Sequence, residues 1–414
     1  MRKNMDESSR NARLIVLKLL LCFLFVFIVA FFVTQVSLGA RTQGVAVSGN
    51  GGARAEGRKQ AVFLPAYLQD SLQQLSRISI RRLSPSWELA ADGEAFITDG
   101  GSNLYVTTTN GQVMALNASS GETLWSLGLG TWVSAPPTVE AGVVYVGATN
   151  HVLYALDAAS GALLWYFTAQ GEILAQPAVS DGLVFISADN DSVYDLVHRL
   201  YAVDARSGAL LWAYDTQSWT QAPPAVGADA VYLGGYLREV YALDKQSGQL
   251  LWSSTAPNIV FSSPRIVDGK VIFTCIDGSV HALDAGDGKL MWSSKLNGFV
   301  WLAPPEGDGI LYACSKDNAV TALALETGEE LWSFEDRGFL SLSSLAGKQT
   351  ICVFSSKGRI SILSPDGERL ALLLAPHDFT SSPLVKGGYI YVRSSDGFIR
   401  AYPLAEEELP GKRP

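Results

Sequence analysis

The stretch ALDAASGALLW at residues 155–165 decides the fold of this 414-residue chain, because variants of it recur along the sequence. The copies are AVDARSGALLW (202–212), ALDKQSGQLLW (242–252), ALDAGDGKLMW (282–292), and the looser ALNASSGETLW (115–125) and ALALETGEELW (322–332). Successive Trp residues of these copies are 40, 47, 40, 40 and 40 residues apart. Such a period indicates a repeat architecture in which each copy contributes one supersecondary unit.

One unit, residues 137–167, alternates short β-branched and aromatic runs with breaks of Gly, Asn, Asp and Ser. This pattern predicts four strands joined by tight turns, and no run of helical periodicity interrupts it. Four strands in a period of about 40–45 residues are typical of a β-propeller blade. The sequence therefore predicts an all-β propeller with four-stranded antiparallel blades.

Each recurring position of the motif has a structural reason. The small Ala lets neighbouring sheets approach, and the Asp accepts hydrogen bonds from the turn that follows. The Gly supplies the positive φ of the return hairpin, and the Trp buries its large face against the adjacent blade. We therefore predict architectural roles for Ala155, Ala202, Ala242, Ala282, Asp157, Asp204, Asp244, Asp284, Gly161, Gly208, Gly248, Gly288, Trp87, Trp125, Trp165, Trp212, Trp252, Trp292 and Trp332.

The two ends of the repeat region set the number of blades. Residues 342–373 form a degenerate copy in which Gly367 survives and the Trp slot holds Ala371 or Leu372. Residues 381–405 supply three strands, whereas Trp87 in SPSWELA belongs to an isolated outer strand. Residues 82–90 are therefore expected to complete the last blade, which removes the exposed edges of an open ring. The prediction is an eight-bladed propeller over residues 82–405, followed by a tail at 406–414.

The motif A-x-D-x-x-S/T-G-x-x-x-W resembles the repeat of pyrroloquinoline-quinone-type propellers over roughly residues 82–405. Asn117, Asp287, Ala324 and the whole seventh copy depart from it. Eight short blades without large insertions look most like BamB of the outer-membrane barrel-assembly machinery, and less like the quinoprotein dehydrogenases. Those dehydrogenases hold their cofactor with an adjacent-cysteine disulfide, a stacking Trp and calcium, and no Cys-Cys pair occurs in this sequence. The resemblance thus implies a protein without a cofactor that is not an enzyme.

The segment preceding the repeats predicts a membrane anchor. Residues 14–38 are largely apolar with Lys18 as their single charge, and about 20 apolar residues span a bilayer. Four basic residues precede the segment and only Arg41 follows closely, so residues 1–13 are expected in the cytoplasm and the propeller outside. The alternative is a signal peptide cleaved at SLGA (37–40). Residues 39–81 are read as a linker, with a short amphipathic helix carrying Leu64, Leu68, Leu72 and Leu75.

The charge distribution excludes nucleic acid as a partner. Residues 1–60 carry nine Lys or Arg against three carboxylates, a charge of +6, which leaves –15 on the remainder of a chain with net charge –9. Phosphate backbones require clustered Lys and Arg, and an acidic body offers none. The same body is unsuited to an anionic membrane surface.

Residue types that often form reactive sites are sparse. Cys275, Cys314 and Cys352 are expected as buried thiols, with a Cys275–Cys314 bridge as the alternative. No His has metal-ligand spacing. The third blade has seven extra residues, in which Asp189, Asn190, Asp191 and Asp195 could converge on Ca²⁺, although the loop glycine and distal Glu of a calcium loop are missing. A solvated loop is the other interpretation.

A second pattern lies seven residues after each Trp slot. Connections from an outer strand to the next inner strand share one face of a propeller, so these residues should ring one mouth of the channel. The loops between second and third strands, including the Asp189–Asp195 insertion, open on the same face. The ring comprises Glu94, Trp132, Glu172, Trp219, Ile259, Phe299, Phe339 and Phe379, with Trp301 just beyond Phe299. These aromatics either plug the starts of the inner strands or form an apolar rim that binds a partner.

Together these patterns predict a single-pass protein of the cytoplasmic membrane with a monomeric extracytoplasmic propeller. Its expected function is protein binding or scaffolding, with a protein or peptide partner in the cell envelope, in the assembly of envelope or outer-membrane proteins. The alternatives are a quinoprotein-type oxidoreductase using pyrroloquinoline quinone, and a sensor or accessory subunit of a membrane complex. Fold alone does not choose between them.

Overall fold

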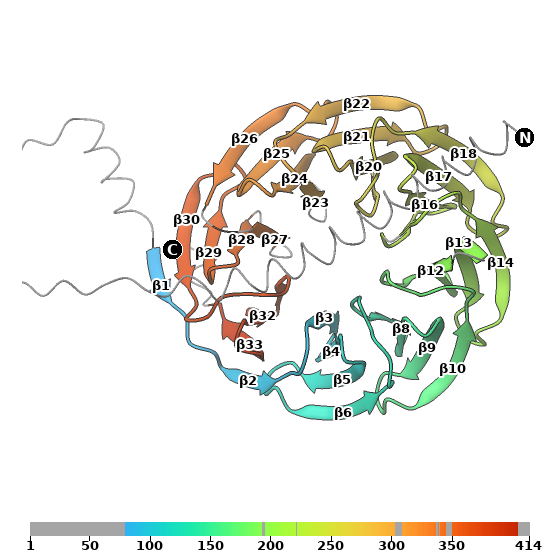
Figure 1. Cartoon of the computed structure of the whole chain (residues 1–414). Helices are drawn as coiled ribbons and strands as arrows, with labels where there is room; N and C mark the ends of the chain where they lie inside the picture. Colours follow the sequence, from blue (N-terminus) through green and yellow to red (C-terminus); the bar gives the residue numbers. More distant parts are fainter. Residues whose placement is uncertain are drawn as a thin grey trace, which may run out of the picture. The chain divides into compact units, whose positions relative to one another are not determined.

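The computed structural model describes residues 79–192, 195–220, 222–302, 309–336, 338, 340–344 and 350–404. Every regular element in these residues is a β-strand. The strands form eight sheets that follow one another around a ring, with the first strand of each blade innermost (Figure 1). The predicted eight-bladed, all-β propeller is confirmed.

The first four blades each contain four strands, ordered from the inner to the outer strand. Blade 1 contains β3 (Ala95–Gly100), β4 (Asn103–Thr108), β5 (Gln112–Asn117) and β6 (Thr123–Gly128). Blade 2 contains β7 (Thr138–Glu140), β8 (Val143–Gly147), β9 (Val152–Asp157) and β10 (Leu163–Thr168). Blade 3 contains β11 (Ala178–Ser180), β12 (Leu183–Ser192), β13 (Asp195–Asp204) and β14 (Leu210–Asp215). Blade 4 contains β15 (Ala225–Val226), β16 (Ala230–Gly234), β17 (Glu239–Asp244) and β18 (Leu250–Thr255).

The other four blades follow the same order, and two of them include strands from the start of the described chain. Blade 5 contains β19 (Arg265–Val267), β20 (Lys270–Thr274), β21 (Ser279–Asp284) and β22 (Leu290–Lys295). Blade 6 contains β23 (Val300–Leu302), β24 (Ile310–Ser315), β25 (Ala319–Ala324) and β26 (Glu330–Glu335). Blade 7 contains β27 (Leu340–Ser344), β28 (Ile351–Ser355), β29 (Arg359–Leu363), β30 (Arg369–Leu374) and β1 (Ser79–Arg82). Blade 8 contains β31 (Leu384–Lys386), β32 (Tyr389–Arg393), β33 (Phe398–Pro403) and β2 (Trp87–Ala90).

The hydrophobic core lies between neighbouring sheets rather than within one. Tyr105 and Val113 of blade 1, for example, form one buried cluster with Val144 and Leu156 of blade 2. The motif Ala is fully buried where it pairs with the Trp, as in the Ala155–Trp165 register. A side chain larger than Ala there would separate the sheets, because interiors are packed at the density of organic crystals.

The motif Trp joins each blade to the next through one hydrogen bond and one close contact. The Trp125 indole Nε1 donates to the carbonyl oxygen of Ala158 in blade 2 at 2.9 Å. The motif Gly of that blade, Gly161, has φ +73°, and a Cβ there would lie 2.6 Å from the Trp125 ring. The same indole-to-carbonyl bond, at 2.7–3.1 Å, is made by Trp87, Trp125, Trp165, Trp212, Trp252, Trp292 and Trp332.

The motif Asp organises the turn that precedes this Gly. Asp157 Oδ1 accepts hydrogen bonds from the Ser160 backbone N–H at 2.8 Å and from the Ser160 hydroxyl at 2.6 Å. The turn thereby fixes the positive-φ glycine on which the neighbouring Trp lies. Asp204 and Asp244 accept the equivalent bonds.

The ring closes as the sequence predicts. Strand β2 lies beside β33 in blade 8 (Figure 1) and pairs with it antiparallel. In this pairing Trp87 is opposite Ala401. Strand β2, from the start of the described chain, thus completes the last blade. This pairing ties the two ends of the repeat region together.

Blade 7 has a fifth strand that the sequence did not predict. Its Trp slot is filled by Ala371, and β1 pairs in parallel with β30 beyond it. Arg81 Nη2 donates to the carbonyl oxygen of Pro403 in blade 8 at 2.8 Å, and Leu83 is buried between the two blades. Residues 79–83 therefore seal the joint that lacks a Trp. Strand β1 accordingly places propeller residues ahead of the predicted boundary at residue 82.

Several predicted features lie outside the described residues. These are the anchor at 14–38 with Cys22, the linker, the short helix at 64–75 and the tail at 406–414. Within the described ranges, no helix has the length and apolar character needed to cross a bilayer.

Replacing Gly288 by Ala tests the Trp joint. A Cβ at Gly288 (φ +70°) would lie 2.5 Å from the Trp252 ring, whereas at Gly182 (φ +78°) it meets nothing within 4 Å. Both substitutions strain the backbone by about 1–2 kcal/mol, but only G288A displaces an indole, so it should lower the free energy of unfolding by about 1–3 kcal/mol more. Urea denaturation measures the difference. Equal losses of unfolding free energy in G288A and G182A would contradict the stabilising role of the Trp–Gly contact.

Candidate functional site

One face of the propeller carries the outer-to-inner connections and the loops between second and third strands. Tyr236 N–H, in the loop of blade 4, donates to the Trp219 carbonyl oxygen at 3.1 Å. Ile276 donates likewise to Ile259 at 3.0 Å in blade 5. These bonds place the two kinds of loop side by side, and we call this side the loop face.

The residues seven positions after each Trp form a rim on the loop face. Thr109 N–H donates to the Glu94 carbonyl and Thr149 N–H to the Trp132 carbonyl, in the same geometry as in blades 4 and 5. The structure brings Glu94, Trp132, Glu172, Trp219, Ile259 and Phe299 to equivalent rim positions. Phe339 lies outside the described residues.

Phe379 does not belong to the rim, which corrects its assignment. The equivalent bond in blade 8 runs from Ser395 N–H to the Asp378 carbonyl, so Asp378 holds the rim position. Phe379 is buried against Tyr402, with ring centroids 6.3 Å apart. The cause is a turn one residue shorter in blade 7: Gly367 N–H bonds to Ser364, three residues back, whereas Gly161 bonds to Asp157, four back.

Five aromatic side chains on blades 4–6 form a continuous row, which we call the aromatic arc. Ring centroids are 5.7 Å apart for Trp219–Tyr236, 6.3 Å for Tyr236–Phe261, 4.7 Å for Phe261–Phe299 and 4.7 Å for Phe299–Trp301. All five are partly exposed. Edge-to-face and tilted pairs of this kind hold aromatic rings in fixed orientations. The arc is thus an ordered apolar surface on the loop face.

Two members of the arc were missed from sequence. Tyr236 lies in a loop between second and third strands, and Phe261 lies two residues after the rim position, where blade 6 has Trp301. A search of both loop types, rather than of the Trp spacing alone, would have found them. Trp132 is 60% exposed on the rim of blade 2.

The seven-residue insertion of blade 3 adjoins one end of the arc. It lengthens β12 and β13, whose pairing continues from Asp189↔His198 to Ser192↔Asp195. His198 Nδ1 lies 3.0 Å from Asp189 Oδ1, and the His198 ring packs edge-on to Trp219 at 6.5 Å. The described part of the insertion therefore extends the β12–β13 hairpin, rather than forming the irregular loop considered from sequence. Among described residues, no three His, Cys, Asp or Glu side chains gather closely enough to bind a metal ion.

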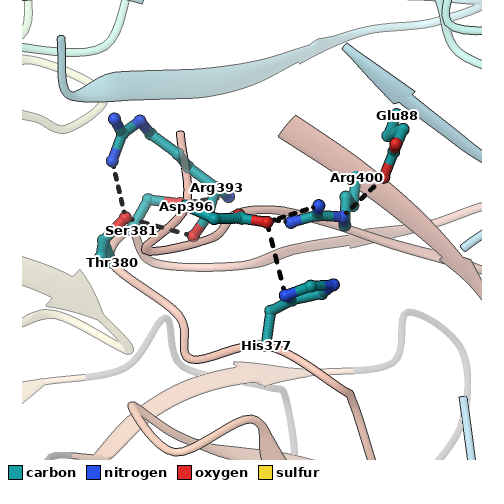
Figure 2. Close-up of polar contacts among 7 residues, drawn as sticks. All are labelled: Glu88, His377, Thr380, Ser381, Arg393, Asp396 and Arg400. Atoms are coloured by element: carbon teal, nitrogen blue, oxygen red, sulfur yellow. Dashed lines mark hydrogen bonds and ion pairs between the residues drawn. The ribbon is translucent and has the colours of Figure 1, made fainter. Parts of the chain in front are cut away.

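The loop face of blade 8 is polar (Figure 2). The Arg400 guanidinium, whose side chain is 3% exposed, donates two hydrogen bonds to the Asp396 carboxylate at 2.6 and 2.7 Å. Its Nε donates to Glu88 on β2 at 3.0 Å, and His377 Nδ1 lies 3.4 Å from Asp396. This network links the closing strand to the loop face. Arg393 bonds separately to Thr380 in the same view.

The described cysteines do not form the adjacent-cysteine disulfide that holds the quinone in quinoprotein dehydrogenases. Cys275, Cys314 and Cys352 are buried and form no disulfide with one another, so the alternative Cys275–Cys314 bridge is not formed. Burial raises the pKa of the Cys275 thiol, which disfavours the reactive thiolate.

The family model of outer membrane protein assembly factor BamB matches residues 73–166, 135–233, 196–288 and 238–410. The chain belongs to this family. BamB from Moraxella catarrhalis is 22% identical with a TM-score of 0.63, and the match covers 78% of this chain and 98% of that chain. No curated protein matches the sequence.

Two other solved structures share the fold of this BamB family member. The designed protein Ika8 is 17% identical with a TM-score of 0.66, covering 79% of this chain and all of its own. Quinohemoprotein alcohol dehydrogenase ADHIIG from Pseudomonas putida HK5 is 15% identical with a TM-score of 0.64, covering 82% and 81%. At these identities the likeness shows the propeller and nothing of its chemistry.

The Asp396–Arg400 pair predicts a pH dependence of stability. Hydrogen bonds from Arg400, and secondarily its charge, hold the pKa of the Asp396 carboxyl below its usual value, although burial opposes them. A lowered folded-state pKa stabilises the protein above the unfolded-state pKa, and this stability is lost as the pH falls through the folded-state value. Asp396→Asn should therefore lose less stability than wild type between about pH 5 and pH 2. Urea titrations at each pH test this, with Glu140→Gln as control; parallel wild-type and D396N profiles would contradict it.

Proposed function

We propose that this protein is a protein-binding or scaffolding module whose contact surface is the aromatic arc. The observation that carries the proposal is the arc itself: five ordered aromatic side chains that remain partly exposed on one face. Binding energy at protein interfaces concentrates on Trp, Tyr and other rigid aromatic anchors. A contiguous exposed row of them is unusual on a monomer and marks an interaction site.

The competing explanation is that the rim aromatics plug the starts of the inner strands. Other residues already fill these positions. The residue after each described rim position is buried, and in blades 2, 3, 5 and 6 it is an almost fully buried aliphatic side chain. These residues are Val133 at 0%, Ile173 at 0%, Val260 at 2% and Val300 at 1% exposure. Because those side chains already fill the space at the starts of the inner strands, the rim aromatics are not needed for packing there. This favours a binding role for them.

We further propose that the propeller acts in the cell envelope, anchored in the cytoplasmic membrane by residues 14–38. The apolar run and the basic residues before it support this placement. Membership of the BamB family supports a role in assembly of envelope or outer-membrane proteins. A sensor or an accessory subunit of a membrane complex would use the same docking face.

Capture of partners tests the role of the arc. The tagged full-length chain is retrieved from detergent-solubilised envelopes, and co-purifying proteins are quantified for wild type, W219S/W301S and W132S. Truncating hot-spot aromatics costs about 2 kcal/mol or more each, so W219S/W301S should reduce recovery of a specific partner at least tenfold. Leu251→Ser on β18, an exposed apolar residue away from the rim, is the matched control.

The arc variants must remain folded for this comparison, so urea denaturation accompanies each capture. Equal recovery by wild type, W219S/W301S and L251S would refute the arc as the contact surface. Loss of the folded state in W219S/W301S, together with wild-type partner recovery by W132S, would instead indicate that the rim aromatics plug the starts of the inner strands.

Cell fractionation tests the anchor. The full-length chain is expected in the cytoplasmic-membrane fraction, with its propeller cleaved by protease added from the extracytoplasmic side, because residues 14–38 span the bilayer. A variant lacking residues 1–38 should move to the soluble fraction. Recovery of the intact chain in the soluble fraction, or protection of the propeller in spheroplasts, would contradict the placement.

A thermal-shift assay distinguishes binding from quinone-dependent oxidation. Pyrroloquinoline quinone with Ca²⁺ should leave the unfolding temperature unchanged, because the described residues gather no metal ligands and the described cysteines form no disulfide with one another. A ligand that binds the folded state at 100 times its Kd would stabilise it by about 2.7 kcal/mol. A concentration-dependent rise in unfolding temperature would support the oxidoreductase instead.

A further inference from the structure

The outer strand of blade 2 is an unprotected sheet edge. Strand β10 is the last strand of its sheet, so one side of its backbone has no partner strand in the described structure (Figure 1). Its side chains Leu163, Leu164 and Tyr166 are 52%, 51% and 63% exposed. No charged residue occurs in LLWYFT, residues 163–168. Edge strands of this kind are templates for pairing with another chain, and proteins usually blunt them with charges or a cover.

The other outer strands are less apolar at the same place. The position after the motif Trp holds Tyr166 in blade 2 but a small residue in the other Trp-bearing blades of the central repeats. Those small residues are Ser126, Ala213, Ser253, Ser293 and Ser333. Blade 2 is therefore the one where an added strand would cover a large aromatic side chain.

The chain itself shows how such an edge is covered. In blade 7, β1 adds in parallel outside β30, with Ser79 opposite Ala371 and Ile80 opposite Leu372. Ala371 and Leu372 are 3% and 9% exposed, whereas Tyr166, at the place of Leu372 in blade 2, is 63% exposed. A strand that pairs with the outer edge of a blade thus buries side-chain positions that are exposed on β10.

The composition of β1 indicates what kind of segment would fit the edge of β10. Its sequence SIRR is followed by Leu83, so it combines apolar and basic residues. Around β10 the nearest motif turns carry Asp157 in blade 2 and Asp204 in blade 3, which are both partly exposed to solvent. Hydrogen bonds from Ser160 and Ser207 lower the pKa of these two carboxyls, so both stay ionised at neutral pH. Basic side chains on an incoming strand would meet complementary charge.

We propose that the outer edge of β10 binds an extended segment of a partner protein that combines apolar and basic residues and pairs in parallel, as β1 pairs with β30. This surface lies on the outer edge of blade 2, apart from the aromatic arc on blades 4–6, so it provides a second and independent contact. Backbone hydrogen bonds would supply affinity, and Leu163, Leu164 and Tyr166 would select apolar side chains.

The probe is a peptide with the sequence of residues 76–86, SRISIRRLSPS, carrying benzoylphenylalanine at the position of Ile80. It is photolysed in excess with the purified full-length chain, and cross-linked residues are mapped by mass spectrometry. Cross-links are expected on residues 163–168. The double substitution L164K/Y166K should reduce them at least tenfold, whereas L251K/S253K, the matched change on β18, should leave them unchanged.

A peptide with Pro in place of Arg81 serves as the backbone control, because Pro removes a donor from the strand ladder. Cross-links spread evenly over all outer strands, confined to β30, or no stronger than those of the Pro peptide would overturn the proposal. Light scattering distinguishes a second copy as the occupant: a dimer of wild type that L164K/Y166K abolishes would also overturn it in favour of self-association.

Discussion

The bond from a Trp indole to a carbonyl of the next blade is the interaction on which this propeller depends. It occurs at seven of the eight joints, always with the indole lying on the positive-φ glycine of the neighbouring turn. The motif residues thus act together: Asp fixes the turn, Gly leaves room for the indole, and the Trp of the preceding blade packs against it. A buried aromatic that also satisfies its N–H gains apolar burial without the cost of an unpaired donor.

The eighth joint, between blades 7 and 8, lacks the motif Trp. Blade 7 has Ala371 instead of Trp, and β1 lies alongside with Leu83 in the seam and Arg81 bonded to blade 8. The guanidinium donates to a backbone carbonyl as the indoles do elsewhere. Two segments that are adjacent in sequence, β1 and β2, therefore close two neighbouring joints. In a repeat protein such departures from symmetry are where individual function arises, and the aromatic arc and the β10 edge are two further departures.

The fold was predictable because the Trp period sets the length of one blade. The isolated strand that carries Trp87 can complete a blade only with the three C-terminal strands. The Phe379 assignment failed because one residue is missing from the turn at Gly367, which shifts the spacing without altering composition. Strand β1 was missed because SIRR shows no alternation and its parallel partner lies almost 300 positions away. Sequence spacing located Trp219, Phe299 and Trp301, whereas Tyr236 and Phe261 join them only through contacts between different loops.

Hydrogen exchange of the indole N–H groups, followed by NMR, tests the role of the Trp joints most directly. We expect the indole protons of the joint residues to exchange slowly, because each is bonded across a joint; these residues are Trp87, Trp125, Trp165, Trp212, Trp252, Trp292 and Trp332. The 60% exposed Trp132 on the rim should exchange rapidly and serves as the internal reference. Joint indoles that exchange as fast as Trp132 would contradict the dependence of the ring on these bonds.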